Sequence, residues 1–301
     1  MVKDVSLPGK ATRFDYQAVD AEKGHLIMAH MGDNAVAIVN LSDGTVVKVI
    51  DGISTARGVA TAPDAKRIFV TSKPNQLVII DSETLEIVSR VETGSSPDGV
   101  AWDSVHRIVG VSDQGDGAVS LIADAGNGGR TQVDVGAETG NVIFDDSREQ
   151  FWVTVVAAED ANLLVAIDPV KATVVKSVDL PDCEGAHGLR LDPERKTGLV
   201  ACEGNAKLMR VPLDGGGGIV SAPTSDGPDV IDVDPGFGWL YVAAEGGDMS
   251  IFDIGKPGLT ELHKQNVGDN AHTVAVDPVT HRVFFPLQDG PVLRIMKPQG
   301  L

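Results

Sequence analysis

The chain has 301 residues, a formal net charge of -18, 42% hydrophobic residues and 4% aromatic residues. This length can bury a large core, and the composition excludes low-complexity, collagen-like and disulfide-scaffold proteins. Nucleic acid and anionic membranes are not expected partners, because both are bound by clusters of Lys and Arg. No uncharged apolar run approaches the length of a transmembrane helix, so a membrane span is also excluded.

One short segment recurs along the whole chain. It consists of a polar residue, a small or apolar residue, an apolar-x-apolar triplet and then Asp or Pro. The copies begin at Asp15, Arg57, Asp98, Gly140, His187, Asp229 and His272. Successive starts are 42, 41, 42, 47, 42 and 43 residues apart, which indicates seven structural units.

Each unit continues with the same order of elements. A β-rich run such as residues 67–72 is followed by a polar turn, an alternating run such as 77–81 and a more polar run such as 85–91. Four short strands joined by turns predict one antiparallel sheet, and no segment keeps a helical period for long. Four-stranded units of this length are propeller blades. The sequence therefore predicts an all-β, seven-bladed β-propeller.

The two ends of the chain predict how the ring closes. The seventh unit has three strands, the last within residues 291–296, and a spare β-rich run at residues 2–7 precedes the first unit. We expect the spare run to pair with the outer edge of the last blade. Residues 1–301 would then form a single propeller domain.

Residues 66–99, which include RIFVTSKPNQLVIIDSETLEIVSRVETGSSPDG, resemble the YVTN repeat of the YncE-like bacterial propellers. The resemblance extends over all seven units, although the literal Tyr-Val-Thr-Asn string is absent and residues 69–72 are its nearest copy. It implies the propeller fold and favours a periplasmic or secreted protein whose leader has been removed. A cytoplasmic location remains open, because the first ten residues have no apolar signal region. Similarity to phosphogluconolactonase and to fungal muconate-cycloisomerase-type propellers suggests lactone chemistry, by analogy of fold.

Seven-fold closure brings the first residue of every inner strand to one mouth of the ring. The second strands run back, so the polar residues that end them should reach the same mouth. We call this set the funnel. Besides the seven inner-strand positions, it contains Lys73, Asp113, Glu203, Asn205, Glu245 and Gln288. A concave site rich in His and carboxylate is the expected binding site.

The funnel contains a candidate metal site. His187, Asp229 and His272 occupy the same position in three successive blades, and such a set suits Zn, Fe, Mn or Ni, with Ca as a further candidate. Glu203 and Glu245 lie beside them as candidate general bases. Two other interpretations stay open: polar side chains that only hydrogen-bond the neighbouring blade, and a ligand pocket without metal.

The remaining funnel residues are predicted to contact a small ligand: Asp15, Arg57, Lys73, Asp98, Asp113, Asn205 and Gln288. The cations Arg57 and Lys73 could bind an anionic group, although Arg57 could instead neutralise neighbouring aspartates. Cys183 and Cys202 flank this mouth. A disulfide is the favoured prediction for them, while buried thiols and metal ligation remain open.

Three functions are consistent with these features. We favour a platform that binds a small molecule or a divalent metal in the funnel. The first alternative is a metal-dependent hydrolase that acts on a lactone or related ester, and the second is a protein-interaction scaffold with a protein partner. The sequence contains neither a Gly-x-Ser-x-Gly elbow nor a Walker loop, so no catalytic motif decides between them.

Overall fold

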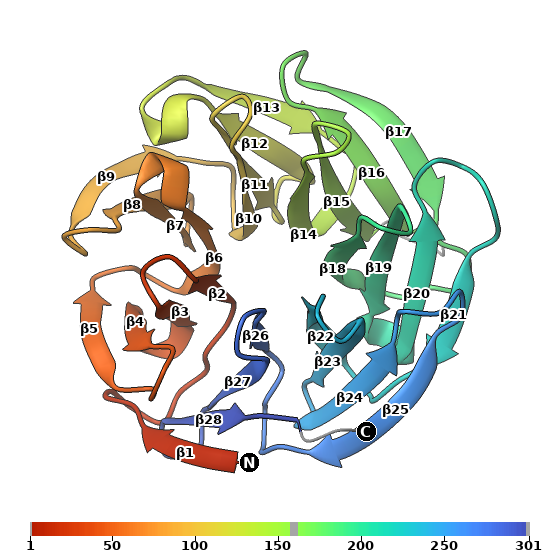
Figure 1. Cartoon of the computed structure of the whole chain (residues 1–301). Coiled ribbons are helices and arrows are strands. Elements are labelled where there is room, and N and C mark those ends of the chain that lie inside the picture. Colours follow the sequence, from red (N-terminus) through yellow and green to blue (C-terminus); the bar gives the residue numbers. More distant parts are fainter. Residues whose placement is uncertain (1, 157–161, 299–301) are drawn as a thin grey trace.

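The computed structural model describes residues 2–156 and 162–298. These residues form seven four-stranded antiparallel sheets arranged in a ring, with the innermost strand of each sheet facing the centre (Figure 1). The predicted seven-bladed, all-β fold is therefore confirmed.

The blades follow one another in chain order, and within blades 1 to 6 the strands run from the centre outwards. Blade 1 contains β2 (Gln17–Asp20), β3 (His25–His30), β4 (Ala35–Asn40) and β5 (Val46–Asp51), and blade 2 contains β6 (Ala56–Ala62), β7 (Arg67–Ser72), β8 (Gln76–Asp81) and β9 (Ile87–Glu92). Blade 3 contains β10 (Pro97–Asp103), β11 (Ile108–Asp113), β12 (Ala118–Ile122) and β13 (Arg130–Asp134), and blade 4 contains β14 (Glu138–Asp145), β15 (Gln150–Val156), β16 (Leu163–Asp168) and β17 (Thr173–Asp179). Blade 5 contains β18 (Ala186–Asp192), β19 (Thr197–Cys202), β20 (Lys207–Pro212) and β21 (Val220–Pro223), and blade 6 contains β22 (Pro228–Asp234), β23 (Trp239–Ala244), β24 (Asp248–Asp253) and β25 (Thr260–Asn266).

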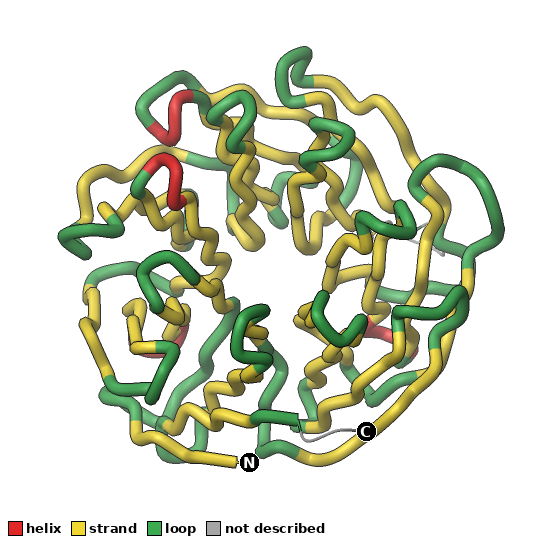
Figure 2. Tube along the Cα trace, in the orientation of Figure 1, coloured by secondary structure: helices red, strands yellow, loops and turns green. Residues whose placement is uncertain are grey.

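Helical structure is confined to short turns in the described part of the chain (Figure 2). These 3-10 turns are η1 (Met31–Asp33), η2 (Pro63–Ala65), η3 (Asp124–Gly126) and η4 (Glu203–Asn205). None of the described helices has the length and apolar character needed to span a membrane.

The seventh blade closes the ring as predicted. It consists of β26 (Ala275–Asp277), β27 (Arg282–Leu287), β28 (Val292–Met296) and, on its outer edge, β1 (Val2–Ser6). β1 pairs with β28 in antiparallel register, with Val2 opposite Met296 (Figure 1). Arg294 reinforces the pairing, because its guanidinium donates hydrogen bonds of 2.8 and 2.6 Å to the two carboxylate oxygens of Asp4.

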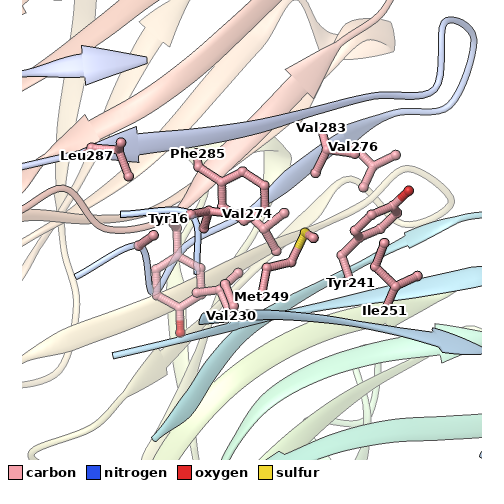
Figure 3. Close-up of a cluster of buried hydrophobic side chains, with 13 residues drawn as sticks. Tyr16, Val230, Tyr241, Met249, Ile251, Val274, Val276, Val283, Phe285 and Leu287 are labelled. Atoms are coloured by element: carbon pink, nitrogen blue, oxygen red, sulfur yellow. The ribbon is translucent and has the colours of Figure 1, made fainter. Parts of the chain in front are cut away.

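The core lies between neighbouring blades, whose sheets pack face to face. Between blades 6 and 7, Met249 and Ile251 from one sheet meet Val283 and Phe285 from the next (Figure 3). The core is mainly aliphatic because the chain has few aromatic residues, and the alternation of β-branched side chains matches the pleat of each strand.

A β-bulge near the start of most inner strands shapes the mouth of the ring. In β6 the pairing with β7 is interrupted between Ala56 and Val59, and the equivalent interruption recurs in β10, β14, β18 and β22. The neighbouring blade approaches closely here, since a Cβ on Gly58 would lie 2.2 Å from the Asp98 carbonyl oxygen. This close approach requires glycine at position 58, and the preceding residue, Arg57, lines the mouth.

Candidate functional site

The mouth of the ring contains a cavity of about 250 Å³. Its walls are formed by Arg13, Asp15, Arg57, Asp98, Gln114, Glu138, Val156, Gly185, His187, Glu203, Asp229 and Glu245. Seven of the predicted funnel residues are in this set, so the structure brings them together. The set contains six carboxyl groups and two guanidinium groups, which makes the cavity strongly acidic.

One side of the cavity is a hydrogen-bonded network around Asp98. Arg57 Nη1 donates to Asp98 Oδ1 at 2.9 Å and to Gln114 Oε1 at 2.8 Å. The Tyr16 hydroxyl donates to Asp98 Oδ2 at 3.0 Å, and burial together with the charge of Asp98 raises the pKa of Tyr16 well above its ordinary value. Arg57 is therefore paired with Asp98, which agrees with the interpretation that Arg57 neutralises a neighbouring aspartate.

His187 forms a bridge between two buried aspartates. Its Nδ1 lies 3.0 Å from Asp229 Oδ1, off the line of a hydrogen bond, and its Nε2 lies 3.5 Å from Asp98 Oδ2. Burial alone would lower the pKa of His187, but the charges of Asp229 and Asp98 raise it well above the ordinary value. The two carboxylates thus favour the protonated form of His187, and an imidazolium has no free lone pair for a metal ion.

On the opposite side of the cavity, Asp229 and Glu245 of its wall come close to His272, which is not itself a lining residue. Each offers one ligand atom, and these atoms all lie within 4.8 Å of one another. His272 is 1% exposed, and its Nδ1 lies 3.0 Å from the Asn270 carbonyl oxygen. A carbonyl can only accept, so Nδ1 is the donor in this contact, and in the neutral ring the lone pair is then on Nε2. That buried Nε2 has no hydrogen-bond partner among the described residues.

Arg13 supplies the positive charge beside these carboxylates. Its guanidinium donates to both oxygens of Glu245, at 2.7 and 3.3 Å, and lies 3.7 Å from Asp229 Oδ2. Asn270 Nδ2 donates to Glu245 at 2.8 Å. Glu245 is therefore fixed in place by two donors, which suits a ligand better than a general base.

Two carboxyl groups in the cavity have raised pKa values. Burial, together with the negative charges of Asp98 and Asp229, raises the pKa of Asp15 to about 8. Burial and the charge of Asp229 also raise the pKa of Glu203. Burial is the largest cause of both shifts and the neighbouring carboxylates add to it, so a cation bound here would be stabilised by these carboxylates.

A disulfide joins Cys183 to Cys202, which confirms the favoured prediction for this pair. It links the loop before β18 to the end of β19, and Glu203 N then donates to the Gly185 carbonyl at 2.9 Å. The disulfide thus braces the part of the mouth that carries Glu203.

Asp113 does not line the cavity, although the sequence placed it there. Its oxygens accept hydrogen bonds from Gly94 N and the Ser120 hydroxyl inside blade 3. The strand pairing shows the reason. Asp113 pairs with Pro97 in blade 3 as Cys202 pairs with Ala186 in blade 5. Asp113 is therefore the structural equivalent of Cys202, and Gln114, the next residue, is the equivalent of Glu203. A shift of one residue along a strand moves a side chain to the other face.

Three other predicted ligand contacts also fall outside the cavity wall. Asn205 holds the preceding loop, since its side chain donates to the Asp182 carbonyl at 2.8 Å and accepts from Glu184 N. Gln288 lies in the turn after β27, and Lys73 lies near the rim, where burial and the charge of Arg57 lower its pKa.

Four polar residues of the site were missed by the sequence analysis: Arg13, Gln114, Glu138 and Asn270. Gln114 follows Asp113 directly, and a correct register would have found it. Arg13 and Asn270 each lie two residues before an inner-strand position that was selected, in segments outside the repeat pattern.

The fold and this site define a seven-bladed β-propeller with an acidic, histidine-containing cavity at one mouth. No protein-family model and no curated protein sequence matches the chain. Solved structures do share its fold. Virginiamycin B lyase from Staphylococcus aureus is similar over 99% of both chains, with a TM-score of 0.82 and 14% identity. Hydrazine synthase from Kuenenia stuttgartiensis matches with a TM-score of 0.82 and 14% identity, over 94% of this chain and 95% of that chain. A streptogramin B lyase matches with a TM-score of 0.81 and 12% identity, over 98% of this chain and 97% of that chain.

Proposed function

We propose that this protein is a YncE-like propeller that binds a divalent cation at Asp229, Glu245 and His272 and presents it to a small ligand in the mouth cavity. The observation that carries the proposal is the buried, unpartnered Nε2 of His272 beside two carboxylates. A buried polar atom without a partner is costly, and coordination of a cation removes that cost.

The surroundings of the three ligands support cation binding. The cavity has an excess of carboxyl groups, and burial together with the charges of Asp98 and Asp229 raises the pKa of Asp15 to about 8. Two oxygen ligands and one imidazole suit Mn²⁺, Fe²⁺ or Zn²⁺. The Arg13 side chain, which lies beside two of these ligands, is 34% exposed and so is partly in contact with solvent.

Titration calorimetry with Mn²⁺ on the chelator-treated protein tests this proposal. We expect one Mn²⁺ per chain for the wild type and a loss of at least about 100-fold in affinity for His272→Gln, because losing a residue that merely orients a ligand already costs about 10–100-fold. Glu245→Gln should weaken binding similarly. His263→Gln, at an exposed position on β25, is the matched control and should bind as the wild type does.

Absence of Mn²⁺ and Zn²⁺ binding by the wild type would refute the proposal. So would equal affinities for the wild type and for a folded His272→Gln variant. A circular-dichroism melt establishes that each variant is folded.

A second candidate function is metal-assisted hydrolysis of a lactone or related ester. It is favoured by Glu203, which lines the cavity and whose pKa is raised by burial and by Asp229. A raised pKa brings a carboxylate closer to the range of a general base that takes a proton from an attacking water. The lyases among the structural neighbours support an enzymatic role by analogy of fold alone. Loss of lactone hydrolysis in Glu203→Gln, with Mn²⁺ binding retained, would distinguish this role from binding alone.

A further inference from the structure

A second and larger cavity, of about 610 Å³, opens at the other end of the ring axis. All seven inner strands contribute to its walls. Tyr16 lines this cavity, while its hydroxyl donates to Asp98 of the mouth cavity, so Tyr16 lies between the two. We call this second space the distal cavity.

The repeat pattern shows that two residues of its wall are exceptional. Three positions after the start of each repeat copy, the seven units have Ala18, Ala60, Ala101, Ile143, Arg190, Asp232 and Ala275. Five units thus place a small or aliphatic residue here, and blades 5 and 6 place an ion pair. A charged pair that breaks an otherwise apolar pattern indicates a local function.

Arg190 and Asp232 are both held by hydrogen bonds, but they differ in how many of their polar atoms have a partner. Arg190 Nε donates to Asp232 Oδ1 at 2.9 Å, and Arg190 Nη1 donates to the Leu189 carbonyl at 3.1 Å. Asp232 also accepts from Val233 N at 3.0 Å and Val276 N at 2.8 Å. Asp232 is thereby fully engaged, whereas the hydrogen bonds of Arg190 to described residues leave Nη2 for an outside acceptor.

The rest of the wall suits a flat apolar body. Val59, Val100 and Ala101 line the distal cavity together with the aromatic residues Trp102 and Phe144. Trp102 is held in place, since its Nε1 donates to Asp64 at 2.8 Å and its ring lies 5.6 Å from that of Phe69. A rigid aromatic wall favours contact with another aromatic ring.

We infer that the distal cavity binds a small aromatic anion, whose ring lies against the apolar wall and whose carboxylate or sulfonate pairs with Arg190. The volume is that of a site for a small organic molecule, and the Nη2 of Arg190, whose Nε is paired with Asp232, supplies an oriented charge-assisted donor in a mostly apolar wall. The inference is independent of the cation site proposed at the mouth.

Titration calorimetry with naphthalene-2-sulfonate and its neutral analogue naphthalene-2-sulfonamide tests the inference. We expect one sulfonate per chain and affinity for the sulfonamide at least about 10-fold weaker, because the neutral group loses a charge-assisted pair. Arg190→Met should reduce sulfonate binding to the sulfonamide level. Arg90→Met, on β9 at the outer edge of blade 2, is the matched control and should leave both affinities unchanged.

Ala18→Phe, which places an aromatic ring inside the distal cavity where the probe would lie, should abolish binding of both probes and so locates the site. The inference is overturned if the wild type binds no sulfonate, or does not prefer it to the sulfonamide. It is also overturned if a folded Arg190→Met or Ala18→Phe variant binds the sulfonate as the wild type does.

Discussion

Arg13 Nη2 lies 2.7 Å from Glu245 Oε1, although 232 positions separate the two residues in the chain. Arg13 belongs to the segment between β1 and β2, and Glu245 directly follows β23 in blade 6. The contact therefore joins the beginning of the chain to the proposed cation site. Its guanidinium also lies 3.7 Å from Asp229, so one side chain partly neutralises two of the three ligands.

This relationship predicts that Arg13 competes with the cation. Arg13→Met should raise the affinity for Mn²⁺ by about 5-fold or more, because a partly exposed ion pair of about 1 kcal/mol no longer has to be broken. Titration calorimetry measures the change. Arg294→Met, which removes an ion pair at the outer edge of blade 7, is the control and should leave the affinity unchanged. An unchanged or lower affinity in Arg13→Met would show that Arg13 does not compete.

The fold could be predicted from the sequence because each blade repeats the same strand order and turn pattern. Closure by β1 was predictable for the same reason. The last unit of the chain lacked a fourth strand, and an unassigned strand preceded the first unit. The inner-strand residues of the site, such as Asp229 and His272, followed from the repeat. Asp113 was misplaced because a one-residue shift in register moves a side chain to the opposite face. Arg13 could not be predicted, since it lies outside the repeat and reaches the site through tertiary structure.

The disulfide should contribute substantially to stability. Cys183 and Cys202 are 19 residues apart, and a closed loop of that size stabilises a fold by about 3 kcal/mol in the chain-entropy model. We expect Cys183→Ala/Cys202→Ala to lower the free energy of unfolding by about 2–4 kcal/mol, measured by urea unfolding.

A reductant provides the control for this double variant. Dithiothreitol should lower the stability of the wild type by a similar amount and should leave the double variant unaffected. A double variant as stable as the oxidised wild type would contradict a stabilising role for the disulfide.

Asp113 should make stability depend on pH below neutrality. Burial raises the pKa of Asp113 from 3.8 to about 6. The hydrogen bond from Ser120 acts in the opposite direction but does not cancel the effect of burial. The folded state then binds the proton more tightly than the unfolded state, so stability from this group is full below about pH 4 and is lost as pH rises to about 6. The loss is on the order of 3 kcal/mol, since one pKa unit corresponds to about 1.4 kcal/mol.

Asp113→Asn removes this titration. The stability of Asp113→Asn relative to the wild type should therefore rise between pH 4 and 6 and level off above pH 6, as measured by urea unfolding at each pH. Ser120→Ala should extend the window to higher pH, because loss of the hydrogen bond that favours the ionised form raises the pKa of Asp113 in the folded state only. A stability difference that is independent of pH would contradict the raised pKa.

The closing strand should stabilise the ring through its backbone. Most side chains of β1 are exposed, and its pairing with β28 is the contact that connects it to blade 7. Deletion of residues 2–6 removes a ladder whose hydrogen bonds contribute about 1 kcal/mol each, so we expect a loss on the order of 3–5 kcal/mol. Asp4→Ala separates the contribution of the strand from that of the ion pair, because it removes the ion pair with Arg294 and keeps the strand. This partly exposed pair should contribute about 1 kcal/mol or less to the free energy of unfolding. If calorimetric melting showed equal losses for the deletion and for Asp4→Ala, stabilisation would come from the ion pair rather than from closure of the ring by the strand.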